Sequence, residues 1–505
     1  MPLFLLMTYL FIRAVPAAAP GYSSEVRKAD TRPNVVVILA DDLGWADTGC
    51  YGNTFNETPS IDRLARQGMR FTQFYAGPVC SPTRANLQSG QDQARFGITQ
   101  HIPGHRRPFA KLIDPAVPPH LPLEVETFAE RLGAAGYATG YFGKWHLNGL
   151  RGPGAPILAT DDHHPGRFGF DEWVSVTNFY DVDPLMSRMG LFEQFQGDSS
   201  EIAVAEAVKF LEEHLPSGKP MFAVIWYGTP HSPFKALPQD RAPFSGLDEN
   251  SANHYGELVA MDRSIGTLRK RLREMGIAET TLLFFCSDNG GLPRITPETV
   301  GGLRGNKGSV YEGGLRVPGI IEWPAVIRPR VTDYPACTMD LFPTVVDILG
   351  LSDDVFVQPL DGISLKPLLT GELPERTKPI PFRFGSKVAM VDNRYKLLTN
   401  DLGQADFQLY DLQADPRETN DISGEQPDRF ARMKRDLLAW NETVDASFAG
   451  KDYPEGNVTP ADPEPQFWFD TPAYAPYLPE WKDRWEFKPY FERRPKPTKA
   501  PRVGR

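Results

Sequence analysis

Cysteine is scarce in this sequence, with four residues in 505, and no two of them are spaced as Cys-x-x-Cys. Thiols so few and scattered exclude a disulfide-stabilised scaffold and a cysteine-based zinc site. Positive charge is also in short supply, because 54 Lys and Arg stand against 64 Asp and Glu and leave a net charge of −10. Nucleic-acid-binding proteins normally carry a basic surface, so this balance argues against that class. If the ligand is an anion, a local group of residues must attract it.

Long apolar runs are missing as well. The most apolar segment near the N-terminus, residues 3–12, is too short to span a bilayer, and it is followed by Arg13 and the small residues 17–19. This order predicts a signal peptide over residues 1–19, and hence a secreted or periplasmic protein without a membrane span. No Lys or Arg precedes the run, so a buried N-terminal strand is the alternative.

Proline and aromatic residues, in contrast, are concentrated at the C-terminus. Residues 451–505 include Trp468, Trp481 and Trp485 among many prolines and other aromatics. A Pro-rich segment without aromatics is typical of a solvated linker. The tryptophans instead predict an extended arm that wraps an apolar surface, with a place at the rim of a substrate cleft as the alternative.

The middle of the chain alternates between two patterns. Short continuous apolar runs, typical of parallel strands buried on both faces, alternate with amphipathic stretches such as 124–135, 201–214 and 257–275. This alternation predicts an α/β sandwich in which helices flank a central, mostly parallel sheet.

Polar residues follow four of the predicted strands at the point where each strand ends. The strands and the residues after them are 34–40 with Asp41 and Asp42, 137–142 with Lys144 and His146, 221–227 with His231, and 282–287 with Asp288 and Asn289. Any one of these residues is an ordinary turn former. Because open α/β sheets bind ligands beyond the carboxyl ends of their strands, the four groups together predict one site at this edge.

The oxygen donors among these residues indicate a metal ion. Asp41, Asp42, Asp288 and the amide oxygen of Asn289 are hard ligands. Such ligands favour Ca²⁺ or Mg²⁺, whereas Zn²⁺ favours His and Cys. For Asp41 and Asp42 taken alone, a helix N-cap is the alternative interpretation.

A cysteine stands at the predicted start of a helix between the first two of these strands. Pro82 suits the first turn of a helix, so Cys80 and Ser81 lie at its N-terminus. Free backbone N–H groups favour anions there. Two interpretations of Cys80 are open at this point, a thiolate nucleophile and a small buried hydrophobic residue.

Several of these segments form an ordered set of motifs. They are Asp-Asp-Leu-Gly (41–44), Cys-x-Pro-x-Arg (80–84), Gly-Lys-Trp-His-Leu (143–147), Thr-Pro-His (229–231), Ser-Asp-Asn-Gly-Gly (287–291), and Lys307 before Glu-Gly-Gly-x-Arg-Val-Pro (312–318). In this order the set resembles the formylglycine-dependent (type I) sulfatases, arylsulfatase-like members of the alkaline-phosphatase superfamily. The resemblance covers residues 33–445.

The resemblance implies an alkaline-phosphatase-like fold. A large α/β domain with a central mostly parallel sheet is followed in that fold by a smaller C-terminal antiparallel sheet with a helix. We therefore expect a catalytic domain over residues 33–375, a C-terminal α+β subdomain over 376–450 and the Pro/aromatic-rich arm over 451–505.

The resemblance also implies a role for each site residue. Cys80 would be oxidised to formylglycine by a formylglycine-generating enzyme, and residue 80 would bind one Ca²⁺, with Mg²⁺ less favoured. The other metal ligands implied are Asp41, Asp42, Asp288 and Asn289. The residues around the sulfate and the nucleophile would be Arg84, Lys144, His146, His231 and Lys307.

The implied reaction is the hydrolysis of a sulfate ester, on a sulfated carbohydrate or an aryl sulfate. One oxygen of the hydrated aldehyde attacks sulfur and leaves a covalent sulfo-enzyme, while His231, assisted by Lys307, protonates the departing alcohol. His146 then removes a proton from the second hydroxyl, so that sulfate is expelled by carbon–oxygen cleavage. Serine has no second hydroxyl and would stay sulfated.

Two other functions remain open on the sequence alone. One is a formylglycine-dependent phosphonate or phosphate esterase of the same superfold, and the other is a catalytically silent carbohydrate-binding relative.

A basic loop contains His101, His105, Arg106 and Arg107. Two interpretations of this loop are open: it binds a sugar carboxylate or a second sulfate, or it is merely solvated.

Overall fold

The computed structural model describes residues 32–102, 120–352, 357–404, 406–452 and 466–492. The predicted signal peptide, residues 1–19, and the loop residues His105, Arg106 and Arg107 lie outside these ranges. Among the described residues, no helix combines the length and the apolar character needed to cross a membrane.

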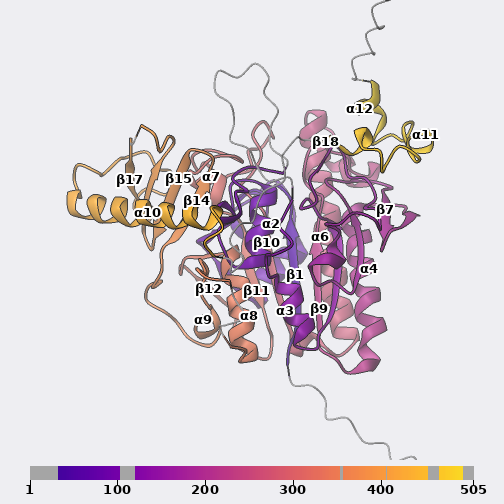
Figure 1. Cartoon of the computed structure of the whole chain (residues 1–505), viewed down its shortest axis with the longest axis horizontal. Helices are drawn as coiled ribbons and strands as arrows, with labels where there is room; N and C mark the ends of the chain where they lie inside the picture. The colour runs from indigo at the N-terminus through magenta and orange to yellow at the C-terminus, as the bar shows by residue number, and fades with distance from the viewer. Residues whose placement is uncertain (1–31, 103–119, 353–356, 405, 453–465, 493–505) are drawn as a thin grey trace, which may run out of the picture.

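A ten-stranded sheet forms the centre of the molecule (Figure 1). Its strands, in spatial order, are β12 (Arg330–Thr332), β2 (Met69–Phe71), β11 (Gly319–Glu322), β10 (Thr281–Ser287), β1 (Asn34–Ala40), β9 (Met221–Trp226), β4 (Ala138–Lys144), β6 (Glu172–Val176), β7 (Leu185–Arg188) and β8 (Leu191–Gln194). The five strands from β10 to β6 run parallel, and β11, β7 and β8 pair antiparallel with their neighbours. The predicted mostly parallel sheet is confirmed.

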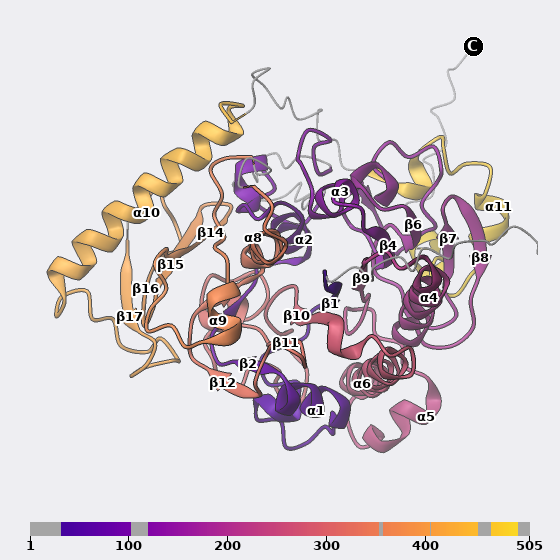
Figure 2. The same ribbon diagram turned by 90° about the horizontal axis from the view of Figure 1, so that it is seen from below.

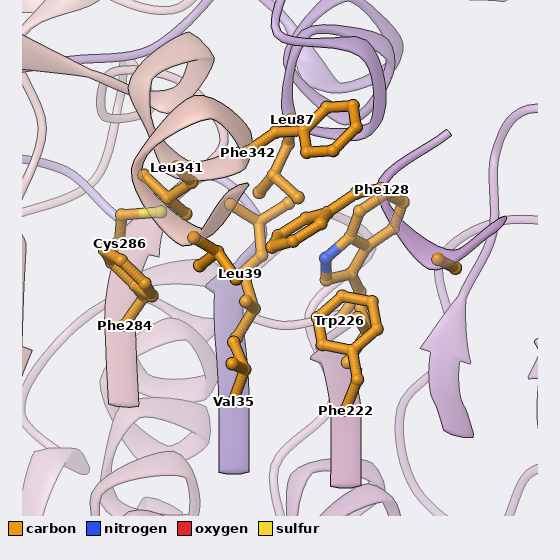
Figure 3. Packing of buried hydrophobic residues seen from close by; sticks show 14 of the residues in the cluster. Val35, Leu39, Leu87, Phe128, Phe222, Trp226, Phe284, Cys286, Leu341 and Phe342 are labelled. Atoms are coloured by element: carbon orange, nitrogen blue, oxygen red, sulfur yellow. The ribbon is translucent and has the colours of Figure 1, made fainter. Parts of the chain in front are cut away.

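Helices cover both faces of this sheet, as Figure 2 shows. One face carries α1 (Pro59–Gln67), α4 (Ser199–His214) and α6 (Glu249–Glu274), and the other carries α2 (Cys80–Ser89), α3 (Phe128–Ala134) and α8 (Leu341–Leu349). Side chains along β1 alternate between the two faces, as the pleat of a strand requires. Figure 3 shows one face, where Val35 and Leu39 of β1 pack under Phe128 of α3 and Phe342 of α8.

The helix boundaries differ from those expected at the N-terminal ends. The stretch 124–135 becomes a shorter helix that begins at Phe128, because Thr127 forms a capping box with Glu130. The stretch 257–275 begins earlier, at Glu249, since the Asp248 side chain accepts hydrogen bonds from the first helical N–H groups. Amphipathic periodicity locates the helices, while the capping residues set where they start.

A second, four-stranded antiparallel sheet lies beside the large one. It contains β14 (Ile380–Phe384), β15 (Lys387–Asp392), β16 (Tyr395–Thr399) and β17 (Gln408–Asp411), and α10 (Pro427–Phe448) packs on one face through Met433 and Leu437. The other face packs against Tyr75, Val310 and Leu315 of the large α/β region. The C-terminal antiparallel sheet with a helix is thus present, and the division of the chain at residues 375 and 450 stays a prediction.

The aromatic arm docks at the opposite end of the large sheet (Figure 1). Its strand β18 (Gln466–Phe467) pairs in parallel with β5 (Leu150–Arg151), and the short helices α11 (Leu478–Trp481) and α12 (Lys488–Glu492) follow. Trp468 is fully buried, and its indole N–H donates to the Pro153 carbonyl at 2.9 Å. Trp468 packs with Trp481 and Phe487 of the arm and with Leu158 of the large α/β region.

We expect Trp468→Ala to release this arm while leaving the rest of the fold intact. Removing a buried tryptophan costs about 3–5 kcal/mol, and here the cost falls on a locally docked segment. Limited proteolysis with chymotrypsin should then cut within residues 466–492 much faster than in the unmodified protein. Asp483→Ala, at an exposed position of the same arm, is the control. Equal cleavage rates in all three proteins would show that Trp468 does not anchor the arm.

The four cysteines are free thiols. Cys80, Cys286 and Cys337 are buried and Cys50 is partly exposed. Burial raises the pKa of Cys50 to about 12 and that of the Cys286 and Cys337 thiols above the ordinary range. This agrees with the absence of a disulfide framework.

Candidate active site

The four strands that end in polar residues are neighbours in the central sheet. β1 lies between β10 and β9, and β4 follows β9 on the other side. Their register aligns Ala40 with Ser287 and Leu39 with Trp226, so the residues that follow emerge at one edge. This parallel register brings together side chains that are as much as about 250 residues apart in sequence, as we predicted from the strand ends.

Asp41 occupies the centre of a fully buried group of charges just beyond β1. Its Oδ2 accepts a hydrogen bond from Lys144 Nζ and lies 3.4 Å from Arg84 Nη2. Arg84 Nη2 also donates to Asp288 Oδ2 at 2.9 Å. Burial by itself would raise the pKa of Asp41, but the surrounding cations, Lys144 foremost, lower that pKa well below its ordinary value. Asp41 is therefore a carboxylate at neutral pH.

Asp42, the next residue, contacts Lys307 and Asn289 on the other side of the site. Its two oxygens lie 2.6 and 2.8 Å from Lys307 Nζ, and Oδ1 accepts a hydrogen bond from Asn289 Nδ2 at 2.8 Å. The backbone of Asp42 has φ 69°, in the left-handed region that non-glycine residues seldom adopt. This turn at the end of β1 aims Asp41 and Asp42 at the same space, which accounts for two adjacent residues sharing one site.

Cys80 lies between the two aspartates, at the first residue of α2. Its Sγ is 3.3 Å from Asp41 Oδ1 and 3.5 Å from Lys307 Nζ, and the residue is 1% exposed. Burial, together with the carboxyls of Asp288 and Asp41, raises the pKa of the Cys80 thiol well above its ordinary value. A thiol kept neutral in this way is a poor nucleophile, which argues against the thiolate interpretation.

The donors around this point fit a divalent cation. Four ligand atoms lie within 4.8 Å of one another, one from each of Asp41, Asp42, Cys80 and His231. Asn289 Oδ1 is buried and has no hydrogen-bond partner in the described part of the chain, so it is available as a further oxygen ligand. Burial and the neighbouring Asp41 raise the pKa of Asp288 to about 7. Crowded carboxyls that would otherwise take up protons are typical of a metal site, and oxygen donors favour Ca²⁺ or Mg²⁺.

Asp288, like Asp41 and Asp42, has both carboxylate oxygens engaged in hydrogen bonds. Oδ1 of Asp288 accepts from the Asp42 N–H at 3.0 Å, and Oδ2 accepts from Arg84. The carbonyl of Asp288 also accepts from the Thr83 hydroxyl at 2.5 Å. Asp288 therefore orients Arg84 and the turn at Asp42, and it can bind a cation only through the remaining lone pairs.

His146 has the geometry of a base. Its Nε2 donates to the Ile102 carbonyl at 2.9 Å, while Nδ1 is buried and unpartnered among the described residues. Burial, and then the cations Lys144 and Arg84, lower the pKa of His146 well below its ordinary value. The ring is thus neutral, with a free lone pair on Nδ1. His146 also has a positive φ of 56°, which is typical of residues held at functional sites.

His231 stands at the outer side of the same group. Nδ1 donates to the Ser232 carbonyl at 2.5 Å, and Nε2 lies 3.7 Å from Asp42 Oδ2. The side chain is 17% exposed and stacks on Phe179, with ring centroids 5.0 Å apart. Burial and Lys307 lower the pKa of His231 to about 4, so the ring is neutral at neutral pH.

Lys307 is the group near His231 that carries a proton at neutral pH. Burial by itself would lower the pKa of Lys307, but Asp42 and the other acidic groups of the site raise it. Its ammonium lies 3.5 Å from Cys80 Sγ and is bound to Asp42. A charged Lys307 beside a neutral His231 can supply the proton that a leaving alcohol needs.

Two parts of the site were missed in the sequence. Tyr141 donates its hydroxyl to the Lys144 carbonyl, and its position inside an apolar run identified it only as a core residue. Phe179 lies in a loop without a recognisable sequence pattern, so no signal connected it with His231.

One residue of the basic loop, His101, lies close enough to His146 to lower the pKa of the His146 ring.

Known proteins resemble this chain over most of its length. A family model described as Sulfatase matches residues 33–351, and one described as N-sulphoglucosamine sulphohydrolase, C-terminal, matches residues 305–441. Human arylsulfatase A is 32% identical over 372 residues, which cover 67% of this chain and 68% of that protein. N-acetylgalactosamine-6-sulfatase from Canis lupus familiaris is 31% identical, with 68% of this chain and 67% of that protein covered.

The fold comparison agrees with the sequence comparison. The crystal structure of Ps i-CgsB in complex with k-i-k-neocarrahexaose superposes with a TM-score of 0.72 at 25% identity, covering 91% of this chain and 99% of that one. The large sheet and the small C-terminal antiparallel sheet of this chain are those of the sulfatase fold. The Sulfatase model matches the segment that holds the four strand ends, and the relatives named above are sulfatases more than 30% identical to this chain. This chain therefore belongs to the sulfatase family and is a sulfuric ester hydrolase.

Proposed function

We propose that this sulfatase cleaves a sulfate ester on a carbohydrate, using formylglycine derived from Cys80 and one Ca²⁺. The observation that supports this most is the site around Cys80, where a buried neutral thiol is enclosed by two carboxylates and Lys307. Arg84, Lys144 and Lys307 supply positive charge in a protein of net charge −10. A local positive site of this kind suits a sulfate ester anion.

The residues that would hold the metal are Asp41, Asp42, Asp288, Asn289 and residue 80, all buried and all at the ends of β1 and β10 or at the start of α2. The metal would supply positive charge at the sulfate oxygens, and hydrated formylglycine would supply a nucleophilic oxygen together with a second hydroxyl through which sulfate can leave. We favour Ca²⁺ because Asp41, Asp42, Asp288 and Asn289 all offer hard oxygen donors.

The remaining residues orient the ester and move protons. Arg84 and Lys144 are locked by Asp41 and Asp288, so their charges are already in place when the anion arrives and need no reorganisation. Lys307 holds a proton that His231 can pass to the oxygen of the departing alcohol. Nδ1 of His146, free and neutral, is the acceptor for a proton from residue 80.

A carbohydrate is the proposed carrier of the sulfate. The name of one relative, N-acetylgalactosamine-6-sulfatase, refers to a sugar sulfate, and Ps i-CgsB was crystallised with k-i-k-neocarrahexaose. The predicted signal peptide favours a secreted or periplasmic enzyme that meets such material outside the cytoplasm. Maturation would then require a formylglycine-generating enzyme in the same host.

Mass spectrometry of the tryptic peptide Phe71–Arg84 tests this proposal directly. Protein made in its native host, or with a formylglycine-generating enzyme, should give a peptide in which residue 80 carries an aldehyde or its hydrate and no sulfur. The same protein should release inorganic sulfate from an aryl sulfate. A thiol that persists at residue 80 even after co-expression with the maturation enzyme would refute the formylglycine proposal.

We expect His231→Ala to discriminate between two kinds of substrate. On a sugar or alkyl sulfate, whose leaving alcohol needs a proton, kcat/KM should fall by about 10²–10⁴-fold. On an activated aryl sulfate the loss should be far smaller, because a phenolate leaves without protonation. Steady-state kinetics on both substrates measures the difference. Equal losses would exclude His231 from the proton-donor role.

A further inference from the structure

A cavity of about 200 Å³ opens next to the site, between the large α/β region and the C-terminal arm. One wall comes from residues 179–185 and the other from the arm, after α11. The residues that line it are Pro153, Gly154, Phe179, Tyr180, Asp181, Val182, Pro184, Leu185, Pro233, Trp485, Glu486, Pro489 and Tyr490. Its volume lies below the roughly 300–1,000 Å³ typical of pockets for drug-sized ligands and suits a single ring.

The cavity adjoins the side of the site from which the alcohol departs. Phe179 forms part of its wall and stacks on the His231 ring. Pro233, two residues beyond His231, forms another part. Because His231 is the proposed proton donor to the departing oxygen, a group attached to that oxygen would extend toward this cavity.

The cavity combines aromatic faces with unpaired hydrogen-bonding groups. Trp485 is 42% exposed, and with Tyr490 it contributes aromatic surface from the arm. Asp181 is 5% exposed, and its Oδ1 has no partner among the described residues. The hydroxyl of Tyr180 and Oε2 of Glu486 are likewise buried atoms without a partner in the described chain. A ligand with hydroxyl groups would satisfy these atoms, whereas a purely apolar ligand would leave them unpaired.

The described lining offers no positive charge to a second anionic group. Among the described residues that line the cavity, two are acidic, Asp181 and Glu486, and none is Lys, Arg or His. The cations near it are engaged elsewhere. Arg484 is paired with Glu486 Oε1, and Lys235 lies over the Trp485 ring at 5.6 Å. Arg84 and Lys144, which act on Tyr180 and Asp181, are paired with Asp288 and Asp41. A carboxylate or sulfate placed here would lose hydration without gaining a charge partner.

We propose that this cavity binds the leaving-group sugar as one uncharged, hydroxyl-bearing ring and excludes a ring that carries a carboxylate or a further sulfate. Trp485 provides the stacking surface, Asp181 and Glu486 accept hydrogen bonds from ring hydroxyls, and the arm thereby acts as a specificity element. This inference rests on the proposed carbohydrate sulfatase activity, and it adds the chemical class of the sugar.

The test compares two matched substrates. One is a neutral hexose monosulfate that the enzyme cleaves, found by screening the positional isomers. The other is the hexuronate with the same sulfate at C2, C3 or C4, the positions to which the screen is confined, because C6 of the hexuronate carries the carboxylate in place of the hydroxymethyl group. We expect kcat/KM, measured by sulfate release, to favour the neutral sugar by about tenfold or more.

Two variants connect this preference with the cavity. Trp485→Ala should raise KM for the neutral sugar about three- to tenfold with little change in kcat, because stacking is lost and the chemistry is not. Glu486→Gln should narrow the preference over the hexuronate, since a negative charge is removed without a change of shape. Lys488→Ala, exposed on α12 and outside the lining, should behave like the unmodified enzyme.

The outcomes separate this inference from the proposed function. Cleavage of aryl sulfate with an equal or greater preference for the hexuronate, or with no effect of Trp485→Ala and Glu486→Gln, would overturn the sugar assignment and leave the sulfatase standing. No sulfate released from any sugar or aryl ester, despite an aldehyde at residue 80, would refute the proposed function itself. Limited proteolysis with chymotrypsin, applied to each variant, reports whether the arm remains docked.

Discussion

Cys80→Ser protein is expected to lose turnover almost completely, by about 10⁴-fold or more in kcat. Serine can occupy the same place at the start of α2, between Asp41 and Lys307, and its single hydroxyl can still attack sulfur. It has no second hydroxyl from which a proton could be removed, so sulfate is not expelled. The variant should therefore retain sulfate on residue 80 after one turnover, as a mass increase on the peptide Phe71–Arg84.

Two control proteins make this prediction specific. Cys80→Ala lacks any nucleophile and should be equally inactive, but it should carry no sulfate. Cys337→Ser changes another buried thiol, far from the motif in sequence, and should keep normal activity. Continued turnover by Cys80→Ser would mean that a single hydroxyl suffices, and the proposed reason for formylglycine would be wrong.

The second large effect is expected from Asp288→Asn. This variant keeps the shape of the side chain but removes one negative charge from the group proposed to hold the metal. We expect the Ca²⁺ content of the purified protein to fall from near one per chain toward zero, and kcat/KM to fall by about 10³-fold or more. Metal analysis of dialysed protein and sulfate-release kinetics measure the two effects together.

The structure offers an alternative role for Asp288, and the same experiment examines it. Both Asp288 oxygens accept hydrogen bonds, from the Asp42 backbone and from Arg84. If metal stays bound while activity is lost, Asp288 positions Arg84 and is not a ligand. Asp47→Asn is the matched control, because Asp47 is buried near the same strand end but pairs with His254 and lies outside the group of ligand atoms. It should retain both metal and activity.

Much of the candidate site could be predicted because each part is encoded locally. Continuous apolar runs identify parallel strands, and parallel strands deliver whatever follows their carboxyl ends to one edge. Asp41, Lys144, His231 and Asp288 were found in this way. The start of α2 was visible from Pro82, which fixed the position of Cys80. The exact helix starts were not predicted, because capping by Thr127 and Asp248 depends on single side chains.

The roles of individual side chains required tertiary geometry. The sequence left Cys80 open between a thiolate nucleophile and a small buried hydrophobic residue. Burial beside Asp41 and Asp288 raises the pKa of its thiol, which argues against the thiolate. The roles of His146 as base and His231 as proton donor were inferred from a resemblance. The buried Nδ1 of His146, without a partner among the described residues, is visible only in the structure. The charge state of a side chain depends on the groups that surround it in space, and its neighbours in the sequence do not determine these groups.

The sequence by itself thus determined the fold class, the family and the set of residues at the strand ends, since short motifs and strand periodicity are properties of the adjacent chain. Only the tertiary structure decided which distant residues lie next to the residues at the strand ends. The arm packs Trp468 near residue 153 and brings Trp485 and Glu486 opposite Asp181, about three hundred residues earlier in the chain. The physical reason is that an aromatic segment docks through apolar contacts, which have no preferred direction. A sequence pattern therefore predicts that the segment is buried, but not which surface it packs against.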